Sequence, residues 1–238
     1  MAHSGTALFN GNIAETEWRT ANTDNGLKWY RYGYDALNRI TSATASSSNY
    51  NVSGIAYDKM GNIQSLTRNG WQNGSYANMD VLDYDYDNGN KLVKVRDNGN
   101  DNYGFKDSSA DDQDYWYDQN GNMTRDDNKG ITAIGYNHLN LPTTVSINGS
   151  GGTGTISYIY DATGVKLKKT VGSSVTDYAS NYIYKNNSLQ FFSTPEGYVE
   201  PKDPNNLALG YNYIYQYKDH LGNVRLSYSD MNNDGSPR

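Results

Sequence analysis

The chain has 238 residues, a formal net charge of −6 and no cysteine. The lack of cysteine excludes disulfides, thiol catalysis and cysteine-ligated zinc, and no cluster of lysine and arginine marks a nucleic-acid surface. No apolar run approaches the roughly 20 residues of a membrane-spanning helix, so we expect neither nucleic-acid binding nor membrane insertion. Because 23 tyrosines stand against four phenylalanines and four tryptophans, tyrosine must supply much of the buried area, which suits long β-sheets.

The chain begins with a short segment of mostly small and polar residues. Met1-Ala2-His3-Ser4-Gly5 has neither a charged start nor an apolar stretch, so it does not match a signal peptide. We therefore expect residues 1–28 to be a lead-in segment with a vector-like start, on a chain excised from a longer protein.

One motif then recurs along the chain: Tyr-Asp, two variable residues, then Gly or Asn. The turn residues are Tyr34, Asp35, Tyr57, Asp58, Gly61, Tyr86, Asp87, Tyr117, Asp118, Gly121, Tyr136, Asn137, Tyr160, Asp161, Gly164, Asp219 and Gly222. In the seventh copy the tyrosine lies one place earlier, at Tyr217, and we interpret Tyr184-Lys185-Asn186-Asn187 as a decayed eighth copy. Such repetition is examined first because a missed repeat leads to the wrong fold.

The motif has a mechanical explanation. An Asp at the first position of a turn accepts hydrogen bonds from N–H groups inside it, and a Gly or Asn three residues later takes the left-handed conformation of a type I turn with a G1 bulge. The sequence therefore predicts a strand on each side of every copy, with the motif glycines at positive φ. Irregular spacing between copies indicates antiparallel hairpins of unequal length rather than a rigid solenoid.

The residues after each turn suggest the strand register. An apolar side chain follows five residues after the Asp in five copies, at Ile40, Ile63, Leu92, Met123 and Val224. Pro142 and Lys166 depart from this rule, so we expect those two copies to have a different register. The acidic segment Asp107–Asp114 is predicted to be a solvated hairpin tip.

Near the end of the chain, tyrosines at 211, 213, 215 and 217 alternate with other residues. This period of two predicts a strand over Tyr211–Lys218 with one packed face. We expect this strand to be an open edge through which the protein self-associates. The patterns together predict an all-β fold of antiparallel β-hairpins.

These residues resemble the YD-repeat, or Rhs, family, which includes bacterial polymorphic toxins, the insecticidal toxin-complex cocoon component and animal teneurins. The resemblance covers about Trp29 to Ser229, and its sharpest part, Tyr217–Arg225, is similar to the start of the Rhs-associated core. It implies a curved, spiralling sheet that forms part of a hollow shell, with the YD-repeat sheet over residues 29–210 and a truncated core start over 211–238. The family's self-cleaving segment has no match here, so no catalytic residue is carried over.

The resemblance also implies a function. The chain would be a non-enzymatic, encapsulating segment of a large secreted or bacterial cell-surface protein. Its partner would be a C-terminal toxin or effector that the shell houses or presents.

Other chemistry is sparse in the sequence. The histidines His3, His138 and His220 lack convergent partners, and no nucleophile–base pair or cofactor motif occurs, so we expect no enzyme and no cofactor. Calcium is the one metal with a candidate site. Asp230, Asn232 and Asp234, with Gly at position 6, match the first half of a calcium loop, but the carboxylate needed at position 12 is missing. The alternative is an ordinary turn rich in Asn and Asp.

An alternative function is that of an extracellular adhesin module for carbohydrate or protein. Exposed Trp71 and Trp116, with nearby Asn and Asp, would form a platform for stacking sugars. Tryptophan at strand positions is more often part of the core. An exposed, concave tryptophan patch would favour the adhesin, and tryptophans buried under a sheet would favour the shell.

Overall fold

The computed structural model describes residues 6–20, 24–107 and 111–229. These residues form β-strands joined by turns, with two short 3₁₀ helices, η1 (Ser48–Tyr50) and η2 (Leu207–Leu209), so the all-β prediction is confirmed. In this part of the chain no helix has the length and apolar character to cross a membrane. The chain divides into two compact units, Met1–Lys129 and Gly130–Arg238.

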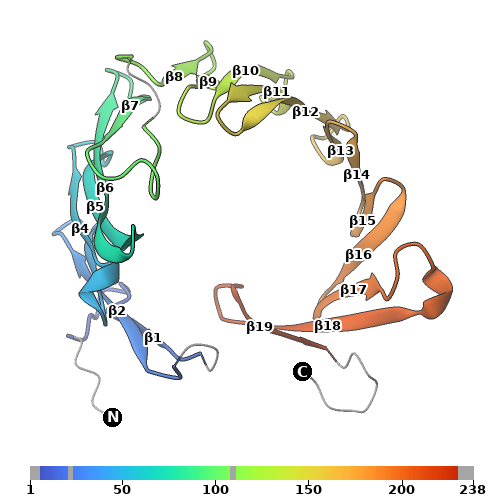
Figure 1. Ribbon diagram of the computed structural model, residues 1–238, viewed down its shortest axis with the longest axis horizontal. Helices are drawn as coiled ribbons and strands as arrows, with labels where there is room; N and C mark the ends of the chain where they lie inside the picture. The colour runs from blue at the N-terminus through green and yellow to red at the C-terminus, as the bar shows by residue number, and fades with distance from the viewer. Residues whose placement is uncertain (1–5, 21–23, 108–110, 230–238) are drawn as a thin grey trace. The chain divides into compact units, whose positions relative to one another are not determined.

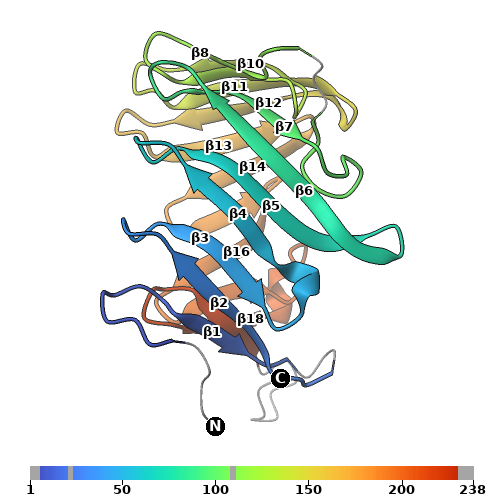
Figure 2. The same cartoon turned by 90° about the vertical axis from the view of Figure 1, so that its left-hand side faces the viewer.

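The first unit contains a seven-stranded sheet in which every strand pairs antiparallel with the next one along the chain. Figure 2 shows these strands lying side by side in chain order, from blue to green. A short hairpin, β8–β9, follows the sheet. The strands are β1 (Glu15–Trp18), β2 (Lys28–Tyr34), β3 (Ile40–Ala45), β4 (Val52–Tyr57), β5 (Ile63–Gln72), β6 (Ser75–Tyr86), β7 (Leu92–Asp97), β8 (Tyr115–Tyr117) and β9 (Met123–Asp126).

The second unit repeats this plan, with each strand from β10 to β19 paired antiparallel with its successor. The labels in Figure 1 follow this order from yellow to red. The strands are β10 (Ile131–Tyr136), β11 (Pro142–Gly149), β12 (Gly152–Tyr160), β13 (Lys166–Val171), β14 (Ser174–Ala179), β15 (Tyr182–Lys185), β16 (Ser188–Thr194), β17 (Gly197–Pro201), β18 (Tyr211–Lys218) and β19 (Val224–Ser229).

All seven copies of the turn have the same register. The residue at the tyrosine position pairs with the residue six places later, whether that residue is apolar, as in Tyr57 with Ile63, or not, as in Tyr136 with Pro142 and Tyr160 with Lys166. The expectation of a different register for the copies at Asn137 and Asp161 is therefore wrong. Turn type and loop length fix the register of a hairpin, and these are the same in every copy.

The proposed eighth copy at residues 184–187 is a different kind of turn. Lys185 pairs with Ser188, and the two residues between them, Asn186 and Asn187, both have positive φ, at 50° and 67°. This is the two-residue hairpin turn of type I′, which asparagine favours. The interpretation as a decayed copy of the longer turn is wrong.

The edge strand of the second unit also differs from expectation. β18 pairs with β17 on one side and with β19 on the other, so Tyr211–Lys218 is an interior strand. The terminal strand is β19, which follows the seventh turn. The turn motif predicts this strand, so the expectation of an open edge at Tyr211–Lys218 is wrong.

A small hydrophobic core lies in the first unit. Leu82, Val95 and Tyr115 are buried together, and partly buried side chains pack around them. One of these, Phe105, comes from the irregular segment between β7 and β8. Elsewhere most strand residues are half-buried, as expected for a thin sheet with two accessible faces.

Candidate functional site: the repeated turns

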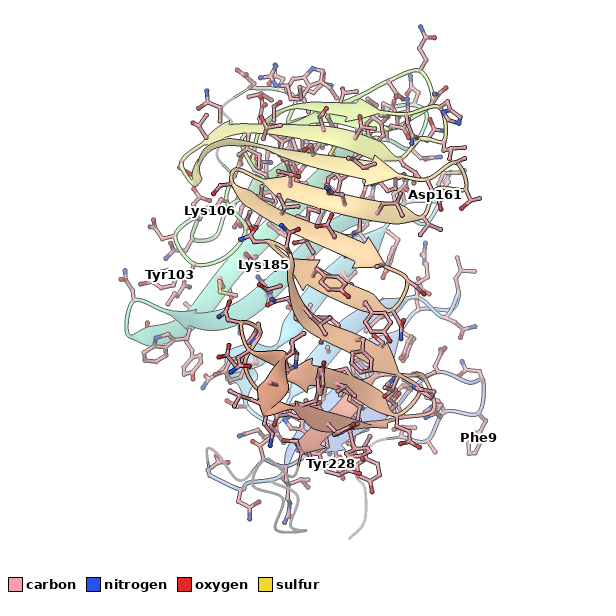
Figure 3. The ribbon with its side chains drawn as sticks, turned by 90° about the vertical axis from the view of Figure 1, so that its right-hand side faces the viewer. Phe9, Tyr103, Lys106, Asp161, Lys185 and Tyr228 are labelled. Atoms are coloured by element: carbon pink, nitrogen blue, oxygen red, sulfur yellow. The ribbon has the colours of Figure 1, made fainter. Side chains whose placement is uncertain are left out.

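The carboxylates of the repeated turns bind the backbone of their own turn. Oδ1 of Asp58 accepts from the N–H groups of Met60 and Asn62 at 2.8 Å each, and Oδ2 accepts from the Asn62 side chain at 2.7 Å. The same two backbone bonds recur in the other six copies, with Asn137 replacing the aspartate in one. Asp161 lies in such a turn between β12 and β13 (Figure 3).

The residue three places after the carboxylate completes each turn. Its N–H donates to the carbonyl oxygen of the Asp or Asn, and its φ is positive in every copy. The left-handed residues are Asn38, Gly61, Asn90, Gly121, Asn140, Gly164 and Gly222. Both glycine and asparagine occur at this position because both tolerate this conformation.

The turn bonds hold these carboxyls in the ionised form. The side-chain amide of Asn122 lowers the pKa of Asp118, with smaller contributions from turn N–H groups and against an opposing effect of burial. The Thr163 hydroxyl does the same for the pKa of Asp161, and the Asn223 side chain lowers that of Asp219. A carboxylate held in this way stays ionised and is a poor general acid at neutral pH.

The motif tyrosines connect one copy to the preceding one. The Tyr57 hydroxyl donates to the carbonyl oxygen of Ile40 at 2.7 Å, and Ile40 is the residue that pairs with Tyr34 in the preceding copy. The same bond joins Tyr86 to Ile63, Tyr117 to Leu92 and Tyr160 to Pro142, at 2.8–3.0 Å. Tyr34 makes it to Ile13 at 2.9 Å. We call these five hydroxyl–carbonyl bonds the tyrosine ladder.

Burial keeps ladder hydroxyls protonated. It raises the pKa of Tyr86, Tyr117 and Tyr160 above the usual value for a phenol. These groups therefore remain hydrogen-bond donors through the physiological pH range.

The residue four places after the Asp reaches forward to the following copy. The Arg39 guanidinium lies 4.4 Å from the centre of the Tyr57 ring, and its Nη1 donates to the carbonyl oxygen of Asp58 at 3.1 Å. Lys91 lies over the Tyr117 ring at 5.6 Å. Together with the tyrosine ladder, these contacts lock neighbouring hairpins in both directions along the chain.

Sequence reasoning missed the outgoing half of a turn ahead of the first copy. Gly11 has a positive φ of 89°, and Asn10–Ile13 has the sequence Asn-Gly-Asn-Ile, against Asn-Gly-Asn-Met at Asn120–Met123. Ala7 stands at the tyrosine position. Because this segment has neither the Tyr nor the Asp of the motif, only its Asn-Gly-Asn string, which recurs at 120–122, could have signalled it. The segment supplies the Ile13 carbonyl oxygen to the Tyr34 hydroxyl.

Buried aspartates outside the turns were also missed. Asp114 is fully buried; its Oδ2 accepts from the Val95 N–H at 2.9 Å and from the Asn128 side chain at 3.0 Å, and its Oδ1 lies 3.7 Å from Lys94 Nζ. Asp80 accepts from the Phe105 N–H at 2.7 Å. The expectation of a solvated tip over Asp107–Asp114 is therefore wrong at its last residue. These carboxylates bind the segment between β7 and β8 to the sheet.

The other candidate residues do not assemble into a chemical site. His138 and His220 are exposed turn residues. Within residues 6–20, 24–107 and 111–229, no three His, Asp or Glu side chains form a group that would hold a metal ion. His3 and the calcium-loop candidates Asp230, Asn232 and Asp234 lie outside the described residues.

The two tryptophans proposed as a platform lie in different surroundings. Trp71 on β5 is 53% exposed, and its ring meets that of Tyr76 edge to face at 5.0 Å. Tyr76 in turn contacts Tyr50, with ring centres 5.3 Å apart. Trp116 on β8 is half-buried, and the Arg125 guanidinium covers its ring at 4.1 Å. Trp71 is therefore open to a ligand, whereas one face of Trp116 is occupied.

Comparison with known proteins gives matches among solved structures. No family model and no curated protein matches the sequence. The structure described as TcdB2-TccC3-Cdc42 matches 92% of this chain at 14% identity with a TM-score of 0.53. TcdB2-TccC3 matches 92% at 15% identity with a TM-score of 0.52. The form of that complex without its hypervariable C-terminal region gives 14% identity and a TM-score of 0.50.

This chain spans only 14% of the length of the first of those chains. At such identities the likeness concerns the backbone fold. The chain therefore shares the β-sheet fold of a part of these much longer TcdB2-TccC3 chains.

Proposed function

We propose that this chain is a non-enzymatic structural segment of a β-sheet shell, within a large secreted or cell-surface protein that houses or presents a C-terminal effector. The observation that carries the proposal is the tyrosine ladder together with the turn carboxylates. Nearly every residue of the repeated motif is used to join a hairpin to itself or to its neighbour.

The chemistry of the turns supports a structural role over an enzymatic one. Catalytic carboxylates need free oxygens and pKa values suited to proton transfer. In the turns, both oxygens of Asp58 accept hydrogen bonds from within the motif, and the pKa of this carboxyl is lowered although burial opposes the shift. A group committed in this way contributes to stability rather than to turnover.

The solved structures support the larger context. They are toxin complexes, and one is described by its missing hypervariable C-terminal region. The likeness to one part of a much longer chain fits a segment of a shell wall. The enclosed effector would then be encoded in another part of the same protein. The effector is the corresponding partner that we propose here.

Protease protection of the effector tests the proposal. In the parent protein, a triple variant with Tyr57, Tyr86 and Tyr117 changed to Phe loses three ladder bonds, each worth about 1 kcal/mol. We expect the region downstream of this segment to become more sensitive to protease. The matched control changes Tyr103, Tyr211 and Tyr213 to Phe, because these tyrosines are exposed. Unchanged protection after deletion of the whole segment would contradict a shell function.

A second candidate function is binding of a saccharide, and the exposure of Trp71 favours it. Beside Tyr50, a groove of about 330 Å³ is lined by Trp18, Tyr30 and Lys28 among others. Flat aromatic rings beside hydroxyl and amine groups suit a ligand with one apolar and one polar face.

Fluorescence titration against a panel of bacterial and host glycans tests this second candidate. We expect quenching that is lost in Trp71→Ala and retained in Trp116→Ala, because the Trp116 ring is already covered by Arg125. The absence of any glycan-dependent change in the wild-type chain would eliminate the saccharide function and leave the shell proposal untouched.

A further inference from the structure

A lysine, an aspartate and an asparagine lie together beside the hydrophobic core of the first unit. Asp114, next to Tyr115 of that core, is fully buried, and Lys94 on β7 is 9% exposed. Asn128 follows β9, and its Nδ2 donates to Asp114 Oδ2 at 3.0 Å. On its other oxygen, Asp114 lies 3.7 Å from Lys94 Nζ. One buried carboxylate therefore neighbours both an amine and a primary amide.

The two oxygens of Asp114 differ in their hydrogen bonds. Oδ2 accepts from the Val95 N–H as well as from Asn128. Oδ1 is buried and has no hydrogen-bond partner among the described residues, because Lys94 Nζ lies beyond hydrogen-bonding distance. A buried oxygen without a partner costs free energy and often marks a site with a chemical role. Asp126 is almost equally buried, but both of its oxygens face Lys129, one at the N–H and the other at Nζ.

These three side chains have the chemistry needed to form an amide. A lysine amine becomes a nucleophile when its proton is removed, and a carboxylate within reach can take that proton. The side-chain carbonyl carbon of asparagine is an electrophile that can release ammonia. Groups held close together react much faster than the same groups free in solution. Asp114 supplies this proximity, since it binds the amide directly and attracts the amine through its charge.

We propose that Lys94 and Asn128 join in an intramolecular isopeptide bond, with Asp114 as the acid–base group. The Lys94 ammonium gives a proton to Asp114 Oδ1, and the resulting amine attacks Cγ of Asn128. The Cγ–Nδ2 bond breaks as Asp114 protonates the departing nitrogen, and Asp114 then takes the surplus proton from Nζ. The products are a secondary amide, ammonia and the protonated carboxyl. The reaction occurs once in each chain and consumes no oxidant or second substrate, so it is a self-modification and not turnover.

The surroundings favour Asn128 over Asp114 as the electrophile. Nucleophiles add poorly to an ionised carboxylate, and Oδ2 of Asp114 already accepts two hydrogen bonds. Lys94 Nζ also donates to the carbonyl oxygen of Asp111, a bond that the neutral amine retains. The new amide closes a loop from residue 94 to residue 128 and so restricts the unfolded chain. It ties β7, the last strand of the seven-stranded sheet, to the β8–β9 hairpin that follows.

The intact mass of the denatured 238-residue chain tests the proposal. We expect a mass lower than that of the sequence by one ammonia, and a proteolytic fragment in which the peptides of Lys94 and Asn128 are joined. Lys94→Arg, which removes the nucleophile, should have the full mass of its own sequence. Asp114→Asn should also have its full mass, because it removes the acid–base group and keeps an oxygen for the Val95 N–H. Lys129→Arg, beside Asn128 and paired with Asp126, is the matched control and should lose ammonia as the wild type does.

Three results would overturn the proposal. The first is a wild-type chain with the full mass of its sequence. The second is a loss of ammonia that persists in Lys94→Arg, because an Asn-Gly pair that cyclises elsewhere in the chain also releases ammonia. The third is a loss of water with Lys94 linked to Asp114, which would make Asp114 the electrophile. The mass and the joined fragment are measured on the wild type, so the outcome does not depend on how well the variants fold.

Discussion

The segment between β7 and β8 and the repeated turns stabilise neighbouring parts of the chain in different ways. Beneath that segment, Leu82, Val95 and Tyr115 pack together and Asp114 is removed from water. At the turns, aspartates remain near the surface and bind their own backbone. Side-chain burial dominates in the first region and local hydrogen bonding in the second. A thin, two-faced sheet therefore needs both a repeated local motif and an occasional packed insertion.

The largest expected effect of a single substitution lies in the packed region. Asp114→Ala leaves the Val95 N–H without its acceptor and Lys94 without its carboxylate, so we expect a loss of about 3–5 kcal/mol in the free energy of unfolding. Asp177→Ala is the control, because Asp177 is a partly exposed partner of Lys168 and its loss costs less than about 1 kcal/mol. Urea unfolding measures both. Equal losses in the free energy of unfolding for the two variants would show that the burial of Asp114 does not add to its contribution.

At the turns, backbone conformation gives the next largest effect. Gly121 has a φ of 85°, so Gly121→Ala is expected to cost about 1–2 kcal/mol. Gly121→Asn should cost less, because asparagine occupies this position in three other copies. Gly151→Ala, in a turn with free space and no positive φ, controls for the loss of glycine flexibility. A similar cost for alanine and asparagine would argue against conformational strain as the cause.

Single bonds of the tyrosine ladder are expected to contribute less. Tyr86→Phe removes one hydroxyl and leaves the Ile63 carbonyl oxygen to water, at a cost of about 1 kcal/mol. Tyr213→Phe, on an exposed ring, should leave the urea midpoint unchanged. Hydrogen exchange gives a second measurement. In Tyr86→Phe, backbone amides between the copies at Asp58 and Asp87 should exchange faster, and amides elsewhere should not.

The pH dependence is expected to come from the turns. The pKa of Asp161 is lowered in the folded protein by the Thr163 hydroxyl and turn N–H groups. Its stabilising effect is therefore complete above the ordinary value of about 3.8 and is lost as the pH falls through the lower folded value. In Asp161→Asn the side-chain oxygen keeps the backbone bonds, as Asn137 does in its own copy, without titrating. Urea midpoints at neutral and acid pH should differ less in this variant than in the wild type.

The repeat, its turn type and its left-handed residues were predictable because they depend on residues within five positions of one another. The register of the copies at Asn137 and Asp161 was not predicted, because the apolar pattern after the turn was given more weight than the turn itself. Pro142 and Lys166 occupy the same paired position as Ile63. Where the loop is constant, its backbone geometry overrides side-chain preference.

The packed region was unpredictable for a different reason. Asp80 and Phe105 meet across 25 residues, and nothing in the sequence separates the buried Asp80 from the many aspartates that form turns. The sequence pattern shows which side chain stands at a position, but it does not show which residues far along the chain will pack against it. The exposed ring of Trp71 and the covered ring of Trp116 were likewise indistinguishable, because the covering group, Arg125, lies on the next strand.

The tyrosine ladder has a consequence for the order of folding. Each hydroxyl bonds to a carbonyl group that lies upstream, between 17 and 25 residues earlier in the chain. The acceptor is therefore always synthesised before its donor. Contacts of such short range favour rapid folding, and a growing chain can add one hairpin at a time onto a finished edge. The direction of the hydroxyl bonds thus matches the direction of translation, so each completed hairpin becomes the template for the one that follows.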